Sequence, residues 1–431
     1  MLKYGYEIKK RHGQKRQGGH GYAFCRRFSA VVLAAAICVC TGCSRISFLS
    51  FQAADGDSSA FDGTLQEEQQ ADPAFLPAAE TENSILGEHG YCYETLSEEE
   101  RKVYEEIYGV LMGKGESGRL SSTDSEQVKK VYYHVIADHP EIFWVDGYRL
   151  DSTSRGGKVL SLDFSMKQTM DKDQVEKWQN VIEDYLQKFM EEAEQAGLDQ
   201  ESGDYERIRF TFDYIVKHTE YDENSENNQN ICSVFGNGLS VCQGYSAAMQ
   251  YLLLYQGIRS ITVSGTTKNT GSSHAWNLVE ADGSWYQLDV TWGDPSYSEG
   301  SNIFEGMVNY TYFCVTDDEI SLTHEVGTEL ELPECTAVED NYYVHENRYF
   351  DEWNEERFQT LMMGSMESGE KYLSIRCGSE ELYQQIRSRL ISEQKIFEYM
   401  ENCASSINET APSQISYFEN KDFLILTFVW K

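Results

Sequence analysis

Residues 238–255 form the stretch that most constrains how this chain can fold. Small residues lead to Cys242, and from there apolar side chains recur at three- and four-residue spacing. The recurring residues are Tyr245, Ala248, Met249, Leu252 and Tyr255. This spacing predicts a largely buried helix, with Gly257 just past its end in a left-handed cap. Cys242 then lies in the first helical turn, where unpaired amide groups and the helix dipole favour the thiolate form of its sulfur.

A hairpin predicted further along the chain offers the partners that a reactive cysteine needs. Two strand-like segments flank Asp282-Gly283, a dipeptide typical of two-residue hairpin turns. Side chains alternate between the two faces of such a hairpin, so its register fixes which residues share a face. The residues expected on one face are His274, Trp276, Asp289 and Thr291. His274 and Asp289 become diagonal neighbours, roughly 7–8 Å apart at Cα, within reach of an imidazole–carboxylate hydrogen bond.

A cysteine, a histidine and an aspartate in this arrangement indicate acyl-transfer chemistry. In this interpretation His274 removes the proton of Cys242 and later protonates the leaving amine. Asp289 selects the tautomer of the imidazole and stabilises the imidazolium. The backbone N–H of Cys242 is one expected donor to the oxyanion, and Gln229 and Gln243 are candidates for the second.

Three sequence blocks resemble the signature of the transglutaminase-like superfamily. They are Val241-Cys242-Gln243-Gly244-Tyr245-Ser246, His274-Ala275-Trp276-Asn277 and Leu288-Asp289-Val290-Thr291-Trp292. The resemblance covers roughly residues 205–295 and implies a papain-like α+β core, in which a helix bearing the cysteine packs on an antiparallel sheet bearing the histidine and the aspartate. It also implies the catalytic roles of Cys242, His274 and Asp289. The block departs from the bacterial pattern at Gly293, where an acidic residue often follows.

The resemblance implies a thioester intermediate formed from a protein or peptide carboxamide or amide and released to an amine or to water. Substrates would be proteins or peptides, including cell-wall peptides. Trp276, Tyr245 and Gln243 are candidate substrate-binding residues. The alternatives are a cysteine peptidase, a cell-wall amidase, or a non-catalytic surface binding module built on the same fold.

No cofactor or metal ion is expected. The polar loop at residues 221–230 lacks the alternating oxygen ligands and the glycine of a calcium loop. His134 and His139 have no further ligands at metal spacing, so packing and capping are their expected roles. Apart from Cys242, the cysteines beyond residue 43 are scattered and match no disulfide scaffold, although one or two bridges stay open. They are Cys92, Cys232, Cys314, Cys335, Cys377 and Cys403.

The amino-terminal segment has the pattern of an export signal. Basic residues precede an apolar run at residues 28–40, about 13 residues long, which is shorter than a bilayer-spanning helix requires. The run ends in Val39-Cys40-Thr41-Gly42-Cys43-Ser44, which resembles the lipobox of bacterial lipoproteins. This resemblance implies cleavage before Cys43, a lipid on its sulfur, and an extracytoplasmic protein anchored to the bacterial cell membrane. An uncleaved signal anchor and a Cys40/Cys43 redox or metal pair are the alternatives.

Charge excludes one class of partner. The chain has 431 residues and a formal net charge of −35, although residues 1–42 carry eight Lys and Arg against one Glu. The remainder is therefore strongly acidic and would repel the phosphates of nucleic acid. We expect no nucleic-acid partner.

The expected fold is α+β, with the papain-like transglutaminase core flanked by two smaller α+β domains. The expected segments are a signal peptide (1–42), an acidic tether (43–90), an N-terminal domain (91–200), the catalytic domain (201–333) and a C-terminal domain (334–431). Ser97 and Glu100 have the spacing of a capping box at a helix start. Residues 142–145 and 310–315 are expected to be strands.

Overall fold

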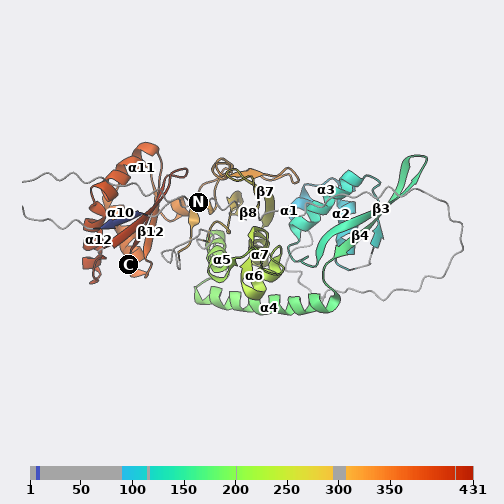
Figure 1. Cartoon of the computed structure of the whole chain (residues 1–431), viewed down its shortest axis with the longest axis horizontal. Coiled ribbons are helices and arrows are strands. Elements are labelled where there is room, and N and C mark those ends of the chain that lie inside the picture. The colour runs from blue at the N-terminus through green and yellow to red at the C-terminus, as the bar shows by residue number, and fades with distance from the viewer. Residues whose placement is uncertain are drawn as a thin grey trace, which may run out of the picture. The chain divides into compact units, whose positions relative to one another are not determined.

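A computed structural model of the chain (Figure 1) describes residues 6–9, 90–113, 117–199, 201–294, 307–412 and 414–430. These residues belong to two compact units that divide between Tyr349 and Phe350. Cys43 and the predicted tether lie outside the described residues. So does the predicted signal peptide, except for Tyr6–Lys9. Within the described part, no helix is both long and apolar enough to cross a membrane.

The first unit begins with helices packed on a small antiparallel sheet. The helices are α1 (Tyr91–Glu94), α2 (Glu98–Leu111) and α3 (Ser125–Asp138), and the strands, in the order β2-β4-β3, are Ser117–Arg119, Lys158–Gln168 and Val145–Arg155. The predicted capping box is present, because the Ser97 side chain accepts from Glu100 N and the Glu100 carboxylate accepts from Ser97 N. Such a box satisfies backbone donors that helical hydrogen bonds leave unpaired.

The strand expected at residues 142–145 begins only at its last residue. Ile142 N donates to the His139 carbonyl and closes a turn, and the Trp144 indole N–H donates to Leu111 O at 3.1 Å inside the core. The apolar run is therefore an anchored turn that leads into β3. Burial of its side chains, and not strand pairing, accounts for its composition.

Four helices and a four-stranded sheet form the rest of the first unit's core. The helices are α4 (Lys172–Gln195), α5 (Asp204–His218), α6 (Ile231–Asn237) and α7 (Cys242–Tyr255). The sheet has the order β10-β7-β8-β9, with strands His324–Val326, Ser260–Thr267, Ser273–Ala281 and Ser284–Leu288. A short parallel pair, β5 (Glu220–Tyr221) with β6 (Leu239–Ser240), precedes α7. Helix α7 packs against β7, β8, α5 and α6, and Figure 1 shows these elements grouped together.

The predicted hairpin is present in the predicted register. Ala281 pairs with Ser284, and Asp282 and Gly283 both have positive φ (48° and 78°), as the two central residues of a type I′ turn require. The pairing ends at Asn277 and Leu288, where the second strand stops. Gly257 has φ 80° just after α7, which confirms the predicted cap.

The prediction of a strand at residues 310–315 is wrong. Tyr310–Tyr312 form a 3-10 helix, whose first turn is capped by the Asn309 side chain, and Cys314 has a φ of 50°. Only Val315 makes an isolated antiparallel bridge, to Gln287. The turn then leads to the short helix α8 (Asp317–Ile320) and to β10.

Residues 334–349 lie in the first unit, although the sequence places a domain boundary after residue 333. Asp317 and Cys335 join this segment to α8 through hydrogen bonds in both directions, Asp317 N to Cys335 O and Cys335 N to Asp317 Oδ2. Helix α9 (Tyr342–His345) follows, and the Asn341 amide at its start donates to Phe313 O. These contacts attach the segment to the part of the chain that carries the hairpin.

The second unit is a small α+β fold. Its sheet, within the described residues, has the order β1-β13-β14-β12-β11, with strands Tyr6–Lys9, Gln414–Asn420, Ile425–Trp430, Tyr372–Cys377 and Tyr349–Phe350. The helices are α10 (Glu355–Glu367), α11 (Glu380–Arg387), which continues as a π-helical turn (Ser388–Ser392), and α12 (Lys395–Ser406). Strand β1 belongs to the predicted signal peptide and pairs antiparallel with β13.

Candidate active site

Cys242 is the first residue of α7, as its sequence surroundings predict. The residue before it, Val241, is extended (φ −116°, ψ 176°) and acts as the N-cap. Cys242 is 8% exposed. The close approach of Ser240 and of the Asn228 backbone requires a glycine two residues further on, because a Cβ at Gly244 would lie 2.1 Å from Ser240 Oγ and 2.8 Å from Asn228 O. The helix start is therefore fixed against the β6 segment.

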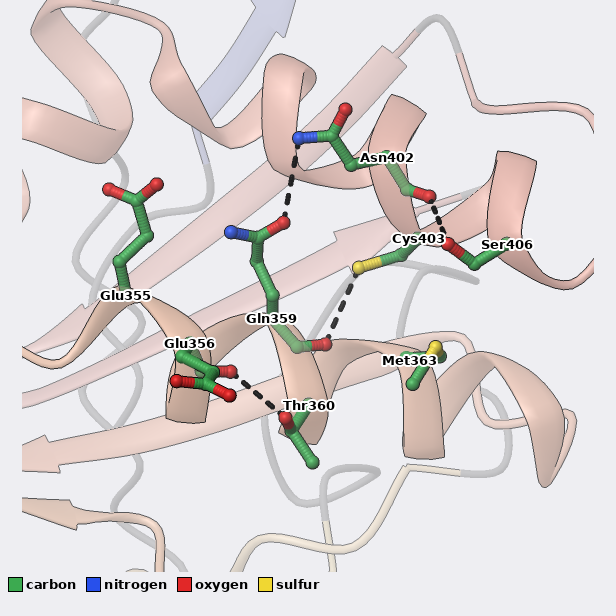
Figure 2. A pocket seen from close by; sticks show the side chains of 8 residues that line it. All are labelled: Glu355, Glu356, Gln359, Thr360, Met363, Asn402, Cys403 and Ser406. Carbon is green, nitrogen blue, oxygen red and sulfur yellow. Dashed lines mark hydrogen bonds between the residues drawn. The ribbon is translucent and has the colours of Figure 1, made fainter.

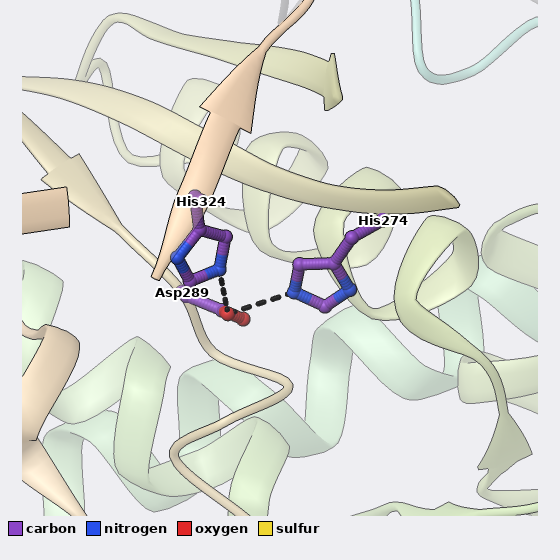
Figure 3. Close-up of side chains that lie close together, drawn as sticks. All are labelled: His274, Asp289 and His324. Atoms are coloured by element: carbon purple, nitrogen blue, oxygen red, sulfur yellow. Dashed lines mark hydrogen bonds and ion pairs between the residues drawn. The ribbon is translucent and has the colours of Figure 1, made fainter. Parts of the chain in front are cut away.

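His274 and Asp289 meet as the hairpin predicts (Figure 3). His274 lies near the start of β8, where it pairs with Gly265 of β7. Asp289 follows β9 directly, and its carboxylate accepts from the imidazole, Nε2 to Oδ2, at 2.8 Å. The side chain of Asp289 is fully buried and that of His274 is 5% exposed. The shared face does not extend to Thr291 as a paired strand, because the pairing of β8 with β9 ends at Leu288 and the chain then turns.

The Cys242 thiol lies near the imidazole of His274, because Cys242 is among the groups that raise the pKa of His274. Since Nε2 is engaged by Asp289, Nδ1 is the nitrogen left for the thiol. The structure thus brings together Cys242, His274 and Asp289, the three residues that the sequence predicts as nucleophile, base and orienter.

His324 is a functional-site residue that the sequence analysis missed. It lies at the start of β10, and its Nε2 is 3.2 Å from the same oxygen of Asp289 that His274 contacts. The other carboxylate oxygen, Oδ1, accepts from the backbone N–H of Trp292 at 3.1 Å. Three donors therefore surround one buried carboxylate. Nothing local in the sequence marks His324, because it reaches the site only through the pairing of β10 with β7.

The two histidines differ in charge. Burial lowers the pKa of His274, but the charge and hydrogen bond of Asp289, with smaller contributions from Cys242, raise it to about 10. Burial also lowers the pKa of His324, and there it outweighs the hydrogen bond and charge of Asp289. Burial alone would raise the pKa of the Asp289 carboxyl, whereas His274 and His324 together hold it well below its usual range. At neutral pH the cluster is therefore an imidazolium, a carboxylate and a neutral imidazole.

Aromatic rings enclose this cluster. The centroid of the His324 ring lies 4.4 Å from Trp292, 4.9 Å from Trp276 and 5.4 Å from Tyr312. Trp292 also lies 5.3 Å from His274. Its buried indole N–H has no hydrogen-bond partner among the described residues, so it is a free donor near the catalytic imidazole. Such a setting excludes water and strengthens the electrostatic interactions within it.

Two of the candidate substrate-binding residues belong to the core instead. Trp276 is completely buried, and its indole N–H donates to Gln287 Oε1 at 2.7 Å. Tyr245 is also completely buried, and its hydroxyl donates to Asp294 Oδ2 at 2.8 Å. Gln243 is partly exposed in the first turn of α7. Gln229 is exposed, and its amide donates to Asn228.

His274, Asp289 and His324 are also the described residues whose side chains could hold a metal ion. Their three ligand atoms lie within 4.8 Å of one another, and all three residues are buried. Both imidazole nitrogens, however, point at one carboxylate oxygen at hydrogen-bond distance. Hydrogen bonds between the ligand atoms themselves, together with the thiol on His274, fit a catalytic triad better than a metal centre.

The seven described cysteines are free and buried. Burial makes the largest contribution to raising the thiol pKa of six of them, Cys92, Cys232, Cys314, Cys335, Cys377 and Cys403. For Cys377 burial, followed by the charge of Glu380, raises the pKa to about 12. Cys242 alone among the seven influences the pKa of a histidine, His274.

A cavity of about 420 Å³ in the second unit contains a thiol but lacks the partners of a triad (Figure 2). It lies between α10 and α12, and its lining includes Cys403, Gln359 and Glu356. The Cys403 thiol donates to Gln359 O at 3.4 Å. Among the described residues, no imidazole lines this cavity.

The fold and the site together define an α+β core of the papain-like type with a Cys–His–Asp arrangement. A family model described as the transglutaminase-like superfamily matches residues 193–290, which include Cys242, His274 and Asp289. The chain therefore contains a domain of the transglutaminase-like superfamily.

Parts of this chain are similar to known proteins. A mouse kyphoscoliosis peptidase is 28% identical over 131 residues, which cover 27% of this chain and 20% of the mouse protein. The human kyphoscoliosis peptidase is 29% identical over 125 residues, covering 26% of this chain and 19% of its own. The chain thus matches about a fifth of the length of these curated relatives. A solved structure described as a TGase is 14% identical and covers 45% of this chain and 56% of its own, with a TM-score of 0.25.

Proposed function

We propose that the transglutaminase-like domain is a cysteine enzyme that transfers acyl groups through a thioester on Cys242. The observation that carries this proposal is the position of His274, whose imidazole donates to the Asp289 carboxylate and whose pKa is raised in part by the neighbouring Cys242 thiol. A thiol gains reactivity when a neighbouring imidazole takes its proton. The buried carboxylate stabilises the imidazolium that this transfer produces.

The first half of the reaction forms the thioester. The Cys242 thiolate attacks the carbonyl carbon of a carboxamide or peptide bond, and the carbonyl electrons move to oxygen. When the tetrahedral intermediate collapses, the C–N bond breaks and His274 gives its proton to the departing nitrogen. The Cys242 backbone N–H is one candidate donor to the oxyanion, and the unpartnered Trp292 indole N–H is a second.

The second half releases the acyl group. An amine or water attacks the thioester, His274 accepts the proton of the attacking group, and the sulfur leaves as a thiolate. Transamidation, deamidation and proteolysis share the thioester and differ in the carbonyl that is attacked and in the acceptor. The name of the kyphoscoliosis relatives supports peptide cleavage as the alternative outcome at this site. A non-catalytic binding module is the other alternative.

Alkylation by iodoacetamide tests the nucleophile directly. Alkylation forms a bond from sulfur to carbon and releases iodide, and its rate follows the thiolate fraction. Cys242 should be the fastest cysteine to react well below pH 8, and His274→Ala should remove that selectivity. Cys377 is the internal reference, because burial raises its pKa to about 12. If Cys242 reacts no faster than Cys377 in the folded protein, the catalytic proposal fails and the result favours a non-catalytic binding module.

Acceptor choice requires a second measurement. Glutamine peptides and peptides from the cell wall would be incubated with the protein and a labelled amine, and the products identified by mass spectrometry. Incorporation of the amine indicates transfer. A mass increase of the peptide that matches hydrolysis of its carboxamide indicates deamidation, and new peptide ends indicate proteolysis.

We also propose that the protein is exported and anchored by a lipid on Cys43, a residue outside the described part. Cleavage before Cys43 would remove β1 and leave β13 at the edge of the second unit's sheet. Cys43→Ala should release the protein from the membrane fraction. If the variant stays membrane-bound and still carries its first 42 residues, the segment is an uncleaved anchor.

A further inference from the structure

His324 contacts the proposed triad at a point where a packing residue would need no polar atom. Its side chain is fully buried, and both ring nitrogens have partners: Nε2 lies 3.2 Å from Asp289 Oδ2, and Nδ1 lies 2.9 Å from Thr323 Oγ1. Trp276, Trp292 and Tyr312 surround the ring, and a phenyl ring would fill the same space. The nitrogens are therefore the feature that needs an explanation.

The partners of His324 determine its tautomer. A carboxylate only accepts hydrogen bonds, so the nitrogen that faces Asp289, Nε2, must carry hydrogen. In the neutral ring Nδ1 is then an acceptor, and the Thr323 hydroxyl can donate to it. The neutral Nε2–H form satisfies the contacts with Asp289 and Thr323, and the backbone of Ile320 is a third hydrogen-bonding neighbour of the ring.

A neutral donor serves the triad differently from a charged one. His274 and His324 share one oxygen of Asp289, and their ring centroids lie 5.2 Å apart. A second positive charge at that distance would oppose the imidazolium of His274. Neutral His324 instead adds a hydrogen bond to the carboxylate and leaves the negative charge of Asp289 to His274.

We propose that His324 is a positioning residue of this site: its neutral Nε2–H, directed by Thr323, holds the Asp289 carboxylate against His274 and thereby stabilises the imidazolium that keeps Cys242 reactive. This inference rests on the proposed function, because it assigns His324 a part in the same triad. His324 acts through Asp289, whose carboxylate its Nε2 contacts.

The charged groups near His324 include more than its two partners. A cavity of about 590 Å³ is lined by His324 together with Lys268, Asp317 and Glu325. Asp317 accepts from the Gln287 amide and from Cys335 N, and Lys268 donates to Ser321 O. Asp289 and His274 face His324 in the cluster itself. These charges could also affect the reactivity of Cys242. The pH profiles are therefore compared only between variants in which Lys268, Asp317 and Glu325 are unchanged.

The test compares two substitutions of His324 in the full-length protein. His324→Phe keeps the ring and removes both nitrogens, whereas His324→Gln keeps an N–H donor at a similar reach. The measured quantity is the rate constant for alkylation of Cys242 by iodoacetamide from pH 5 to 9. His134→Phe is the matched control, because His134 is also buried but bonds a backbone carbonyl of its own helix, Lys130 O.

His324→Phe should lower the Cys242 rate at pH 6 about tenfold and move the acid limb of the profile up by about one pH unit, as expected for one lost hydrogen bond to a charged group. His324→Gln should restore most of the rate, and His134→Phe should leave the profile unchanged. If His324→Phe is folded and reacts like the wild type, or if His324→Gln is as slow as His324→Phe, the positioning role is overturned. Failure of the proposed function would differ, since wild-type Cys242 itself would then show no selectivity.

Two further measurements apply if His324→Phe does not fold. Thr323→Val removes the hydroxyl that directs Nδ1 and should shift the acid limb in the same direction by a smaller amount. Nitrogen NMR of the wild-type imidazoles should show His324 as the neutral Nε2–H tautomer at pH 7. A protonated ring or an Nδ1–H tautomer at that pH would contradict the proposal.

Discussion

Replacing Asp289 with asparagine removes the charge at the centre of the site and leaves the side chain's shape intact. In the wild type three donors meet this carboxylate: His274 Nε2 at 2.8 Å and His324 Nε2 at 3.2 Å, both on Oδ2, and Trp292 N at 3.1 Å on Oδ1. An asparagine has one oxygen and one NH₂ group. In either orientation its NH₂ group faces at least one of these donors, so a buried donor loses its acceptor.

The size of the effect follows from those contacts. A hydrogen bond to a charged group contributes about 1.5–3 kcal/mol, and 1.36 kcal/mol corresponds to one pKa unit. Without the carboxylate, burial becomes the dominant influence on His274, and its pKa falls from about 10 to below 6.5, the ordinary value. The imidazolium is then lost at neutral pH. We expect Asp289→Asn to slow alkylation of Cys242 at pH 6 on the order of a hundredfold.

The assay is the pH profile of iodoacetamide alkylation, with each cysteine quantified by peptide mapping. Asp138→Asn is a matched control, because Asp138 is also a buried aspartate with three donors, Cys92 N, Tyr93 N and the Tyr104 hydroxyl. This control should lower the free energy of unfolding and leave the Cys242 profile unchanged. If folded Asp289→Asn reacts within about threefold of the wild type, the reasoning about its charge is refuted.

Three further predictions follow from the same structure. The pKa of His274 is raised from 6.5 to about 10, so the stabilisation from its ion pair with Asp289 is complete below pH 6.5 and disappears as the pH rises through 10. In chemical denaturation the free energy of unfolding of the wild type should therefore fall more between pH 7 and 10 than that of His274→Gln. Equal losses would contradict the assignment. Gly244→Ala should lower the free energy of unfolding by about 1–3 kcal/mol and slow Cys242 alkylation, because a Cβ there would lie 2.1 Å from Ser240 Oγ. Gly257 has φ 80° and open space around it, so Gly257→Ala should lower the free energy of unfolding by about 1–2 kcal/mol and leave alkylation unchanged. Removal of metal ions with EDTA should leave the Cys242 rate within about twofold, and a larger loss would favour a metal ion held by the two histidines and Asp289.

Local signals in the sequence predicted the parts of the site that neighbouring residues determine. Asp282-Gly283 fixed the hairpin register, since two residues with positive φ define that turn. The periodicity that begins at Cys242 predicted a buried helix, and the sulfur lies in its first turn. With the register known, the approach of His274 to Asp289 followed from strand geometry.

Contacts between distant segments could not be predicted in the same way. His324 lies in a strand of three residues, too short for an alternating pattern, and it reaches Asp289 only because β10 pairs with β7. The same arrangement covers the face on which Trp276 lies, which is why a tryptophan expected to meet substrate is buried. Residues 310–315 have the composition of a strand, but the cap at Asn309 and the positive φ of Cys314 impose a turn.

The measurement that tests the central claim most directly is capture of the thioester on Cys242. The protein would be incubated with glutamine peptides or cell-wall peptides, quenched in acid, digested and examined by mass spectrometry. The account predicts an acyl adduct on the peptide that contains Cys242, released by hydroxylamine and absent from Cys242→Ala and His274→Ala. An adduct on any other cysteine, or none at Cys242 in protein that iodoacetamide still alkylates selectively there, would contradict the account.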